Sequence, residues 1–178
     1  IVSGAIGQDL FSAGGNTVIT SPVAGDARLA GGNITITAPI GEDLLAAGGT
    51  IILIDKSSVG GDLWLAGGSI SVNAPVKGSV RIGGEDVLIN SAIGGSVDIR
   101  ARRLTFGPKA VVTGAITYRG ANPAVIADGA TVSEIDFKKF ERGSARPIFT
   151  IGLILGLISM ALTAFLLLHF FRHTMHEL

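Results

Sequence analysis

One unit of apolar and polar positions repeats along most of the chain, and the copy from Val59 to Pro75 reads VGGDLWLAGGSISVNAP. The copies start 17 or 19 residues apart, at Ile6, Val23, Ile40, Val59, Val76, Ile93 and Val112. Self-similarity at a short, nearly fixed period is the sequence signature of a solenoid. The apolar pattern therefore predicts one repetitive domain over residues 1–132.

Within each unit the apolar residues come in two pairs, as in Leu63 and Leu65 followed by Ile70 and Val72. The members of a pair are two residues apart, which is typical of a strand with one buried face. Strands that recur every 17 residues cannot pair as hairpins, so they must stack in parallel, one coil on the next. We predict an all-β parallel β-helix of about seven coils of 17–19 residues, each coil holding two or three short strands.

Two kinds of corner separate these strands. Ala-Gly-Gly stands between the two apolar pairs at residues 13–15, 30–32, 47–49 and 66–68. Glycine permits a positive φ and avoids a Cβ clash, so we expect a turn there. A Ser-Pro or Ala-Pro pair at 21–22, 38–39 and 74–75 marks a second corner, because proline has no N–H to donate to the strand ladder.

The C-terminal part has a different character. Residues 133–146 are charged and amphipathic, and they predict a juxtamembrane linker, either a short cap or a helix. Residues 147–171 predict a transmembrane helix, since Ile148 to Leu168 contains no charged residue and would span about 32 Å of a bilayer core of about 30 Å. Residues 172–178 form a short basic, histidine-containing tail.

Small residues line one side of the predicted span: Gly152, Gly156, Ser159 and Thr163. Such a face allows close packing of a second helix, although small residues are also common in membrane helices without a partner. The lipid bilayer is thus one expected partner, and another subunit of a membrane complex is a second.

Charge is balanced overall but not along the chain. The chain has 14 basic and 14 acidic residues, so we expect no nucleic-acid partner. It has no cysteine, so it cannot form a disulfide. Residues 1–75 have six acidic and two basic side chains (net −4), whereas residues 76–146 have seven acidic and eleven basic ones (net +4). The basic half includes Arg100, Arg102, Arg103 and Arg119. It could meet anionic headgroups or the acidic half of a neighbouring rod, or it could be an ordinary solvated surface.

An aspartate precedes the first apolar pair in four successive units, at Asp9, Asp26, Asp43 and Asp62. Stacked carboxylates are a candidate metal site, because Ca²⁺ binds oxygen ligands of this kind. Alternatively, each aspartate accepts hydrogen bonds from backbone N–H groups at a turn. Serine replaces aspartate in the next two units, which favours the second interpretation.

A second set of candidates points away from the predicted core. Phe11, Leu45 and Trp64 occupy one outward position in successive units, interleaved with Arg28 and Arg81. Exposed apolar side chains on a flat sheet indicate a lateral contact. We therefore predict a surface for self-association or for another protein there.

The three histidines all follow the repeats, at His169, His173 and His176. Their spacing puts them on one face of a helix, where they could bind a metal or a haem-type ligand, or simply lie at the membrane interface. Residues 1–168 contain no histidine, no Ser/His/Asp set and no phosphate-binding loop. We therefore expect neither catalysis nor a cofactor.

The repeats GDLWLAGGSISVNAPVKGSV and EDLLAAGGTIILI resemble bactofilins, a bacterial polymer-forming cytoskeletal family, over residues 1–132. This resemblance implies a right-handed, three-sided β-helix that assembles end to end without nucleotide. The C-terminal span is more similar to bactofilin-like integral membrane proteins, in which a segment resembling LLLHFFRHTMHEL follows the first span.

Three functions follow as hypotheses. The first is a non-enzymatic, membrane-anchored scaffold that self-associates or organises other proteins. The second is an accessory subunit of a membrane complex, docked through its span. The third is an extracytoplasmic module that binds cations or glycans along the aspartate edge. The resemblance implies an exported β-helix, whereas the basic residues before the span favour the cytoplasmic side.

Overall fold

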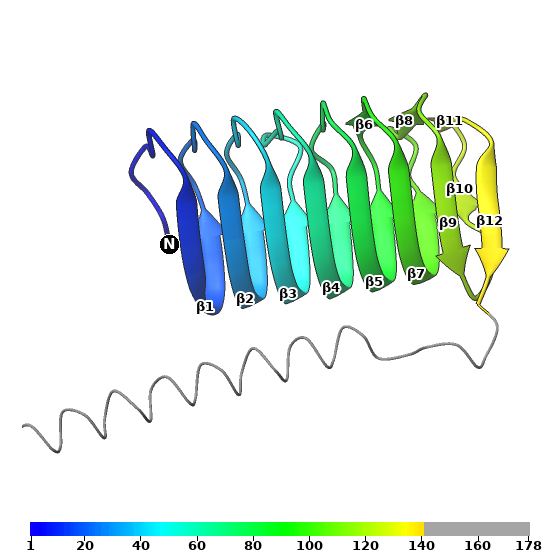
Figure 1. The fold of residues 1–178 in the computed structure, drawn as a ribbon, viewed down its shortest axis with the longest axis horizontal. Coiled ribbons are helices and arrows are strands. Elements are labelled where there is room, and N and C mark those ends of the chain that lie inside the picture. The colour runs from blue at the N-terminus through cyan, green and yellow to red at the C-terminus, as the bar shows by residue number, and fades with distance from the viewer. Residues whose placement is uncertain (141–178) are drawn as a thin grey trace, which may run out of the picture. The chain divides into compact units, whose positions relative to one another are not determined.

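The computed structural model of the protein describes residues 1–140, and this part is an all-β parallel solenoid, as the repeat predicts (Figure 1). Six long strands form its body: β1 (Leu10–Ile19), β2 (Ala27–Ile36), β3 (Leu44–Leu53), β4 (Leu63–Val72), β5 (Val80–Ile89) and β7 (Val97–Phe106). They are followed by β9 (Ile116–Gly120) and β12 (Ile135–Lys139). These eight strands lie side by side in sequence order, so the solenoid has about eight turns.

Short strands complete the turns. β6 (Ala92–Ile93), β8 (Val111–Val112) and β11 (Thr131–Val132) form a separate three-stranded sheet at one corner. Single parallel bridges continue that corner towards the N-terminus. They join the first residues of successive repeat units, from Ile6 to Val76. β10 (Val125–Ile126) pairs with the end of β7. The residues that begin the repeat units therefore form one continuous ladder of parallel bridges along the solenoid.

The bend at Ala-Gly-Gly differs from the prediction, because no turn interrupts the strand there. Each long strand runs through it for ten residues and folds back on itself, so that it has two arms (Figure 1). The glycines do not have a positive φ either, since Gly129 is the only residue with one between residues 1 and 140. A Cβ on Gly48 would lie 2.5 Å from the carbonyl oxygen of Gly31 on the preceding coil. Close approach of successive backbones therefore requires glycine at this bend in β2, β3 and β4, whereas Ala101 occupies the equivalent position in β7.

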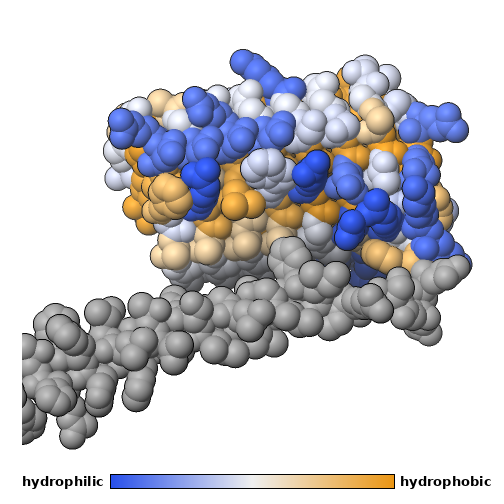
Figure 2. Space-filling view, viewed as in Figure 1, coloured by the Kyte–Doolittle hydropathy of each residue, from blue (hydrophilic) through white to orange (hydrophobic). Residues whose placement is uncertain are grey.

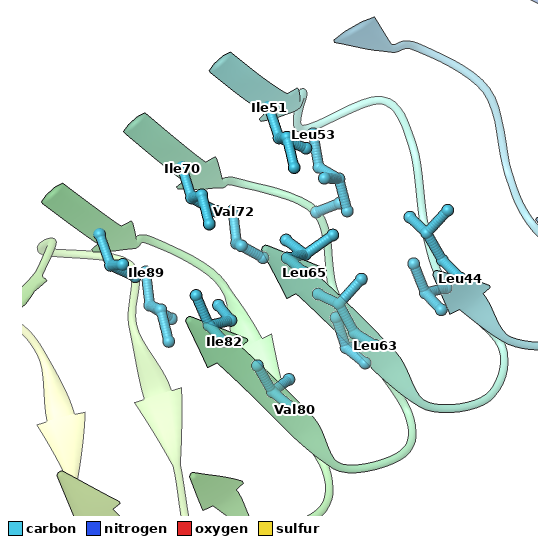
Figure 3. Packing of buried hydrophobic residues seen from close by; sticks show 14 of the residues in the cluster. Leu44, Ile51, Leu53, Leu63, Leu65, Ile70, Val72, Val80, Ile82 and Ile89 are labelled. Carbon is cyan, nitrogen blue, oxygen red and sulfur yellow. The ribbon is translucent and has the colours of Figure 1, made fainter. Parts of the chain in front are cut away.

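The interior is filled by stacked aliphatic side chains. Leu44, Leu63 and Val80 lie one above another on the first arm, and Ile51 and Ile70 do so on the second (Figure 3). All five are at most 1% exposed. Only Thr17, Ser57 and Ser91 are buried polar side chains within residues 1–140. One coil cannot bury these columns alone, so the coils stabilise one another.

The C-terminal end of the solenoid lies further along the chain than predicted. Residues 135–139 form β12, which pairs in parallel with β9, so this part of the stretch at 133–146, for which the sequence predicted a short cap or a helix, is a strand of the solenoid. The ring of Phe137 lies 5.4 Å from that of Tyr118, which is completely buried. The last strand therefore covers the end of the core, and the domain boundary lies near Phe140.

The remaining predictions lie outside the described residues. They concern the span at 147–171, its small residues Gly152, Gly156, Ser159 and Thr163, the tail at 172–178, and His169, His173 and His176. Within residues 1–140, no helix has the length and the apolar character needed to cross a membrane.

Candidate interaction face

The outward side chains of the first arms form one flat face of the solenoid, which we call the lateral face. It has three columns that run along the solenoid axis. The carboxylate column contains Asp9, Asp26, Asp43, Asp62, Ser79, Ser96, Ala115 and Glu134. The middle column contains Phe11, Arg28, Leu45, Trp64, Arg81, Asp98, Thr117 and Asp136. The third column contains Ala13, Ala30, Ala47, Ala66, Gly83, Arg100, Arg119 and Lys138.

Backbone hydrogen bonds explain the carboxylate column. The N–H of Asp26 donates to Oδ1 of Asp9 at 3.0 Å, and the N–H of Asp43 donates to Oδ1 of Asp26 at 3.0 Å. The series continues with the N–H of Asp62 on Asp43 at 2.7 Å and the N–H of Ser79 on Asp62 at 2.8 Å. Each aspartate thus satisfies a donor of the next coil, as the turn interpretation expects.

No metal cluster accompanies this arrangement within residues 1–140, because no three His, Cys, Asp or Glu side chains are grouped so that they could hold an ion. Each of the four aspartates keeps its second carboxylate oxygen outside the backbone hydrogen bonds. The Ca²⁺ site therefore stays a prediction, and its test is given below.

The middle column has three large apolar side chains in the N-terminal half, interrupted by Arg28. Phe11 is 69% exposed and Leu45 is 45% exposed, while Trp64 is half-buried. Arg28 lies over the Phe11 ring, 5.2 Å from its centre, and forms an ion pair with Asp26 at 3.0 Å. Figure 2 shows apolar and charged side chains alternating along this face. The structure thus exposes these side chains on a flat sheet, but nothing covers them within residues 1–140.

The third column changes character at the middle of the solenoid. Four alanines and Gly83 give way to three cations, with Arg100 directly beside Arg119 and Arg119 beside Lys138 on adjacent strands. Stacked like charges are unfavourable in a strand ladder. Lys138 pairs with Asp136 at 3.0 Å, but neither Arg100 nor Arg119 has a carboxylate within 4.0 Å among residues 1–140. This half of the face therefore presents uncompensated positive charge.

Arg102 and Arg103 do not belong to that column, although the sequence places them beside Arg100. They lie on the second arm of β7, where Arg103 binds Asp86 at 2.8 Å and Arg102 approaches Glu85 at 3.6 Å. The hydrogen bond from Arg103 lowers the pKa of Asp86, and the charges of both arginines act in the same direction. These two arginines therefore link β7 to β5 instead of forming one basic surface with Arg100 and Arg119.

Two features of the face were missed in the sequence. In the sequence, the alanines at 13, 30, 47 and 66 belong to the predicted Ala-Gly-Gly turn, and no pattern distinguishes Asp98 from the other charged residues. Both appear when every residue is assigned to a column by its distance from the start of its unit. The alternation of inward and outward positions then puts them beside the aromatic residues.

Comparisons with protein-family models, with curated proteins and with solved structures gave no match to this chain.

Proposed function

We propose that this protein is a non-enzymatic, membrane-attached structural protein whose solenoid self-associates or scaffolds other proteins. The observation that supports this most is the lateral face, where Phe11 and Leu45 stand exposed on a flat, regular sheet. Apolar patches of this kind favour protein contacts. A solid aliphatic interior provides the rigid support that such a surface needs.

The finer features belong to the same proposal. By its resemblance to bactofilin-like membrane proteins, the solenoid is right-handed and three-sided and lies on the extracytoplasmic side, attached through a span at residues 147–171. No nucleic acid and no cofactor take part in this function. The repeat pattern of residues 1–132 and the uncharged stretch from Ile148 to Leu168 support these features.

The proposal is tested by electron microscopy and light scattering of the full-length protein in detergent. We expect particles larger than a monomer, and we expect the double variant Phe11→Ser/Leu45→Ser to reduce them at least tenfold at equal concentration. The control variant Ile52→Ser/Val111→Ser also removes two exposed apolar side chains, but from other parts of the surface. Monomers at every concentration, without a bound partner protein, would contradict the proposal.

A further inference from the structure

The two halves of the lateral face differ in a way that makes them complementary. In the N-terminal half the carboxylate column contains four aspartates. In the C-terminal half the third column contains three cations, Arg100, Arg119 and Lys138. Both ladders have the same pitch, about 4.8 Å, because both are set by the spacing of parallel strands. A ladder of one sign on one copy can therefore match a ladder of the other sign on a second copy over several coils.

We propose that the partner of the lateral face is a second copy of this chain, packed face to face, parallel and shifted by four coils. This inference rests on the proposed function and specifies its contact. The second copy is related to the first by a half-turn about an axis parallel to the solenoid, together with a shift of four coils. The half-turn puts the carboxylate column of one copy opposite the third column of the other and leaves the middle columns opposite each other.

This arrangement brings opposite charges together throughout the contact. The facing pairs of opposite charge are Asp26 with Arg100, Asp43 with Arg119, Asp62 with Lys138 and Arg28 with Asp98. Phe11 faces Arg81, which suits a cation–π contact. Ala13, Ala30 and Ala47 face the small residues Ser79, Ser96 and Ala115, whereas Ala66 faces Glu134. No side chains of like charge face each other.

Two of the charges that meet have no ion pair within the described solenoid, whereas Asp26, Arg28 and Lys138 already form one. Arg100 and Arg119 have no carboxylate within 4.0 Å in the described part of the chain. Attraction between such groups and a complementary surface sets both the register and the choice of partner.

Other registers of the same face either put like charges together or match fewer opposite charges. A shift of one coil, for example, brings together only Arg81 with Asp98 and Arg119 with Glu134, two pairs of opposite charge instead of four. Without a shift, Arg28 faces Arg28 and Arg81 faces Arg81, and a shift of three coils puts Arg28 opposite Arg81. An antiparallel pair that overlaps the apolar halves puts Asp26 opposite Asp43. Like charges in contact across an interface are strongly unfavourable, so they select against these arrangements.

The contact has a further consequence, because it uses different halves of the two copies. The second copy keeps its own N-terminal half free, so a third copy can bind in the same way. Two successive shifts of four coils equal the eight coils of the solenoid, and the third copy therefore follows the first in line. The expected assembly is a double row of half-staggered solenoids.

Each single contact is small. Four coils at about 4.8 Å and one strand arm give a footprint on the order of 300 Å² per copy, compared with about 800 Å² in a standard interface. A single contact is therefore weak, and the assembly depends on repetition and on low ionic strength, since salt screens exposed charges.

Cysteine cross-linking tests the register directly, because the chain has no cysteine of its own. Full-length Ala47→Cys protein is mixed with full-length Ala115→Cys protein at low ionic strength and treated with a short bismaleimide cross-linker, because facing sheets lie about 10 Å apart, too far for a direct disulfide. We expect a cross-linked heterodimer as the main product. Ala47→Cys mixed with Val111→Cys or with Ser96→Cys should give at least fivefold less, since Val111 lies off the lateral face and Ser96 faces Ala47 only after a shift of three coils.

Charge reversal provides a second measurement. Arg100→Glu/Arg119→Glu should raise the concentration needed for assembly at least tenfold. Lys77→Glu/Lys109→Glu changes the net charge equally at two exposed sites off the face and should leave it unchanged. If the wild-type protein assembles but the Ala47–Ala115 cross-link does not exceed the Val111 control, this contact is wrong while the proposed function stands. If the wild-type protein stays monomeric at low ionic strength and binds no partner protein, both are wrong.

Discussion

At the scale of single residues, the first glycine at the bend of β2, β3 and β4 is determined by the coil before it. An added Cβ at Gly31, Gly48 or Gly67 would lie 2.5 Å from a carbonyl oxygen of the preceding coil. Real Cβ atoms do not approach oxygen so closely, and the neighbour is backbone, which cannot move without disturbing the ladder. The contact distance between coils therefore fixes these residues, independently of φ.

We expect Gly48→Ala to destabilise the solenoid by about 1–3 kcal/mol, the usual cost of forcing an extra methyl group into a packed site. Gly83→Ala is the matched control, because a Cβ there meets nothing within 4 Å. Its stability should stay within about 0.5 kcal/mol of wild type. Urea unfolding followed by circular dichroism measures both, and equal midpoints for the two variants would contradict the account.

The carboxylate column gives a second test at this scale. Asp43→Ala removes the acceptor for the half-buried N–H of Asp62 and should cost about 1–3 kcal/mol. Asp43→Asn keeps a carbonyl acceptor at the same place and should recover at least half of that loss. If the column instead holds Ca²⁺, excess Ca²⁺ will raise the urea midpoint of the wild type but not of Asp43→Asn; we expect no change in either.

The pKa of Asp86 gives a third test, by NMR titration of its carboxyl group. Its folded pKa lies below the usual value, first because of the hydrogen bond from Arg103. The ionised form is therefore stabilised at pH values above the usual pKa of an aspartate, and this stabilisation is lost as the pH falls through the lowered value. We expect Arg103→Ala to move the titration midpoint upwards and Arg119→Ala to leave it unchanged.

At the scale of elements, β12 acts as the end cap of the core. It pairs with β9 through residues Ile135 to Lys139 and brings Phe137 against Tyr118. Its other edge carries Asp136, Lys138 and Lys139, and charged side chains discourage further strands from pairing there. The strand both finishes the solenoid and limits growth at this end.

We expect Phe137→Ala to lower the free energy of unfolding by about 1–3 kcal/mol, since it exposes part of the Tyr118 ring and removes a half-buried aromatic pair. Phe140→Ala removes a side chain that is 48% exposed and should cost less than about 0.5 kcal/mol. Thermal unfolding compares the two, and a larger loss for Phe140→Ala would show that β12 is not the cap.

The sequence predicts these elements unevenly, for physical reasons. The aliphatic columns are readable because each inward position repeats in every coil, as with Leu44, Leu63 and Val80. The continuous strand through Ala-Gly-Gly cannot be predicted from the sequence, because glycine is as typical of turns as of close backbone approach. β12 offers only Ile135 and Phe137 as inward positions, and five residues are too few to separate a strand from an amphipathic helix.

The candidate site was predicted in part for similar reasons. Phe11, Leu45 and Trp64 were identified because large apolar residues at an outward position are unusual. The separation of Arg102 and Arg103 from Arg100 depends on the bend of β7, which reverses the course of the strand between them. Local sequence spacing does not reveal that change of direction.

At the scale of the whole molecule, the described solenoid is an electrically polar rod. Residues 1–75 carry a net charge of −4, from six acidic and two basic residues, while residues 76–140 carry +3, from six acidic and nine basic ones. When two copies of such a rod are in lateral contact, the opposite charges on its two halves favour one shift between the copies over others. The lateral face provides both the apolar surface and the charge pattern for it.

Lateral self-association of this rod is the central claim, and sedimentation velocity of the full-length protein in detergent tests it most directly. We predict that the mean sedimentation coefficient rises with protein concentration at low ionic strength and returns to the monomer value when salt screens the charges. A monomer value at every concentration and ionic strength would contradict the account.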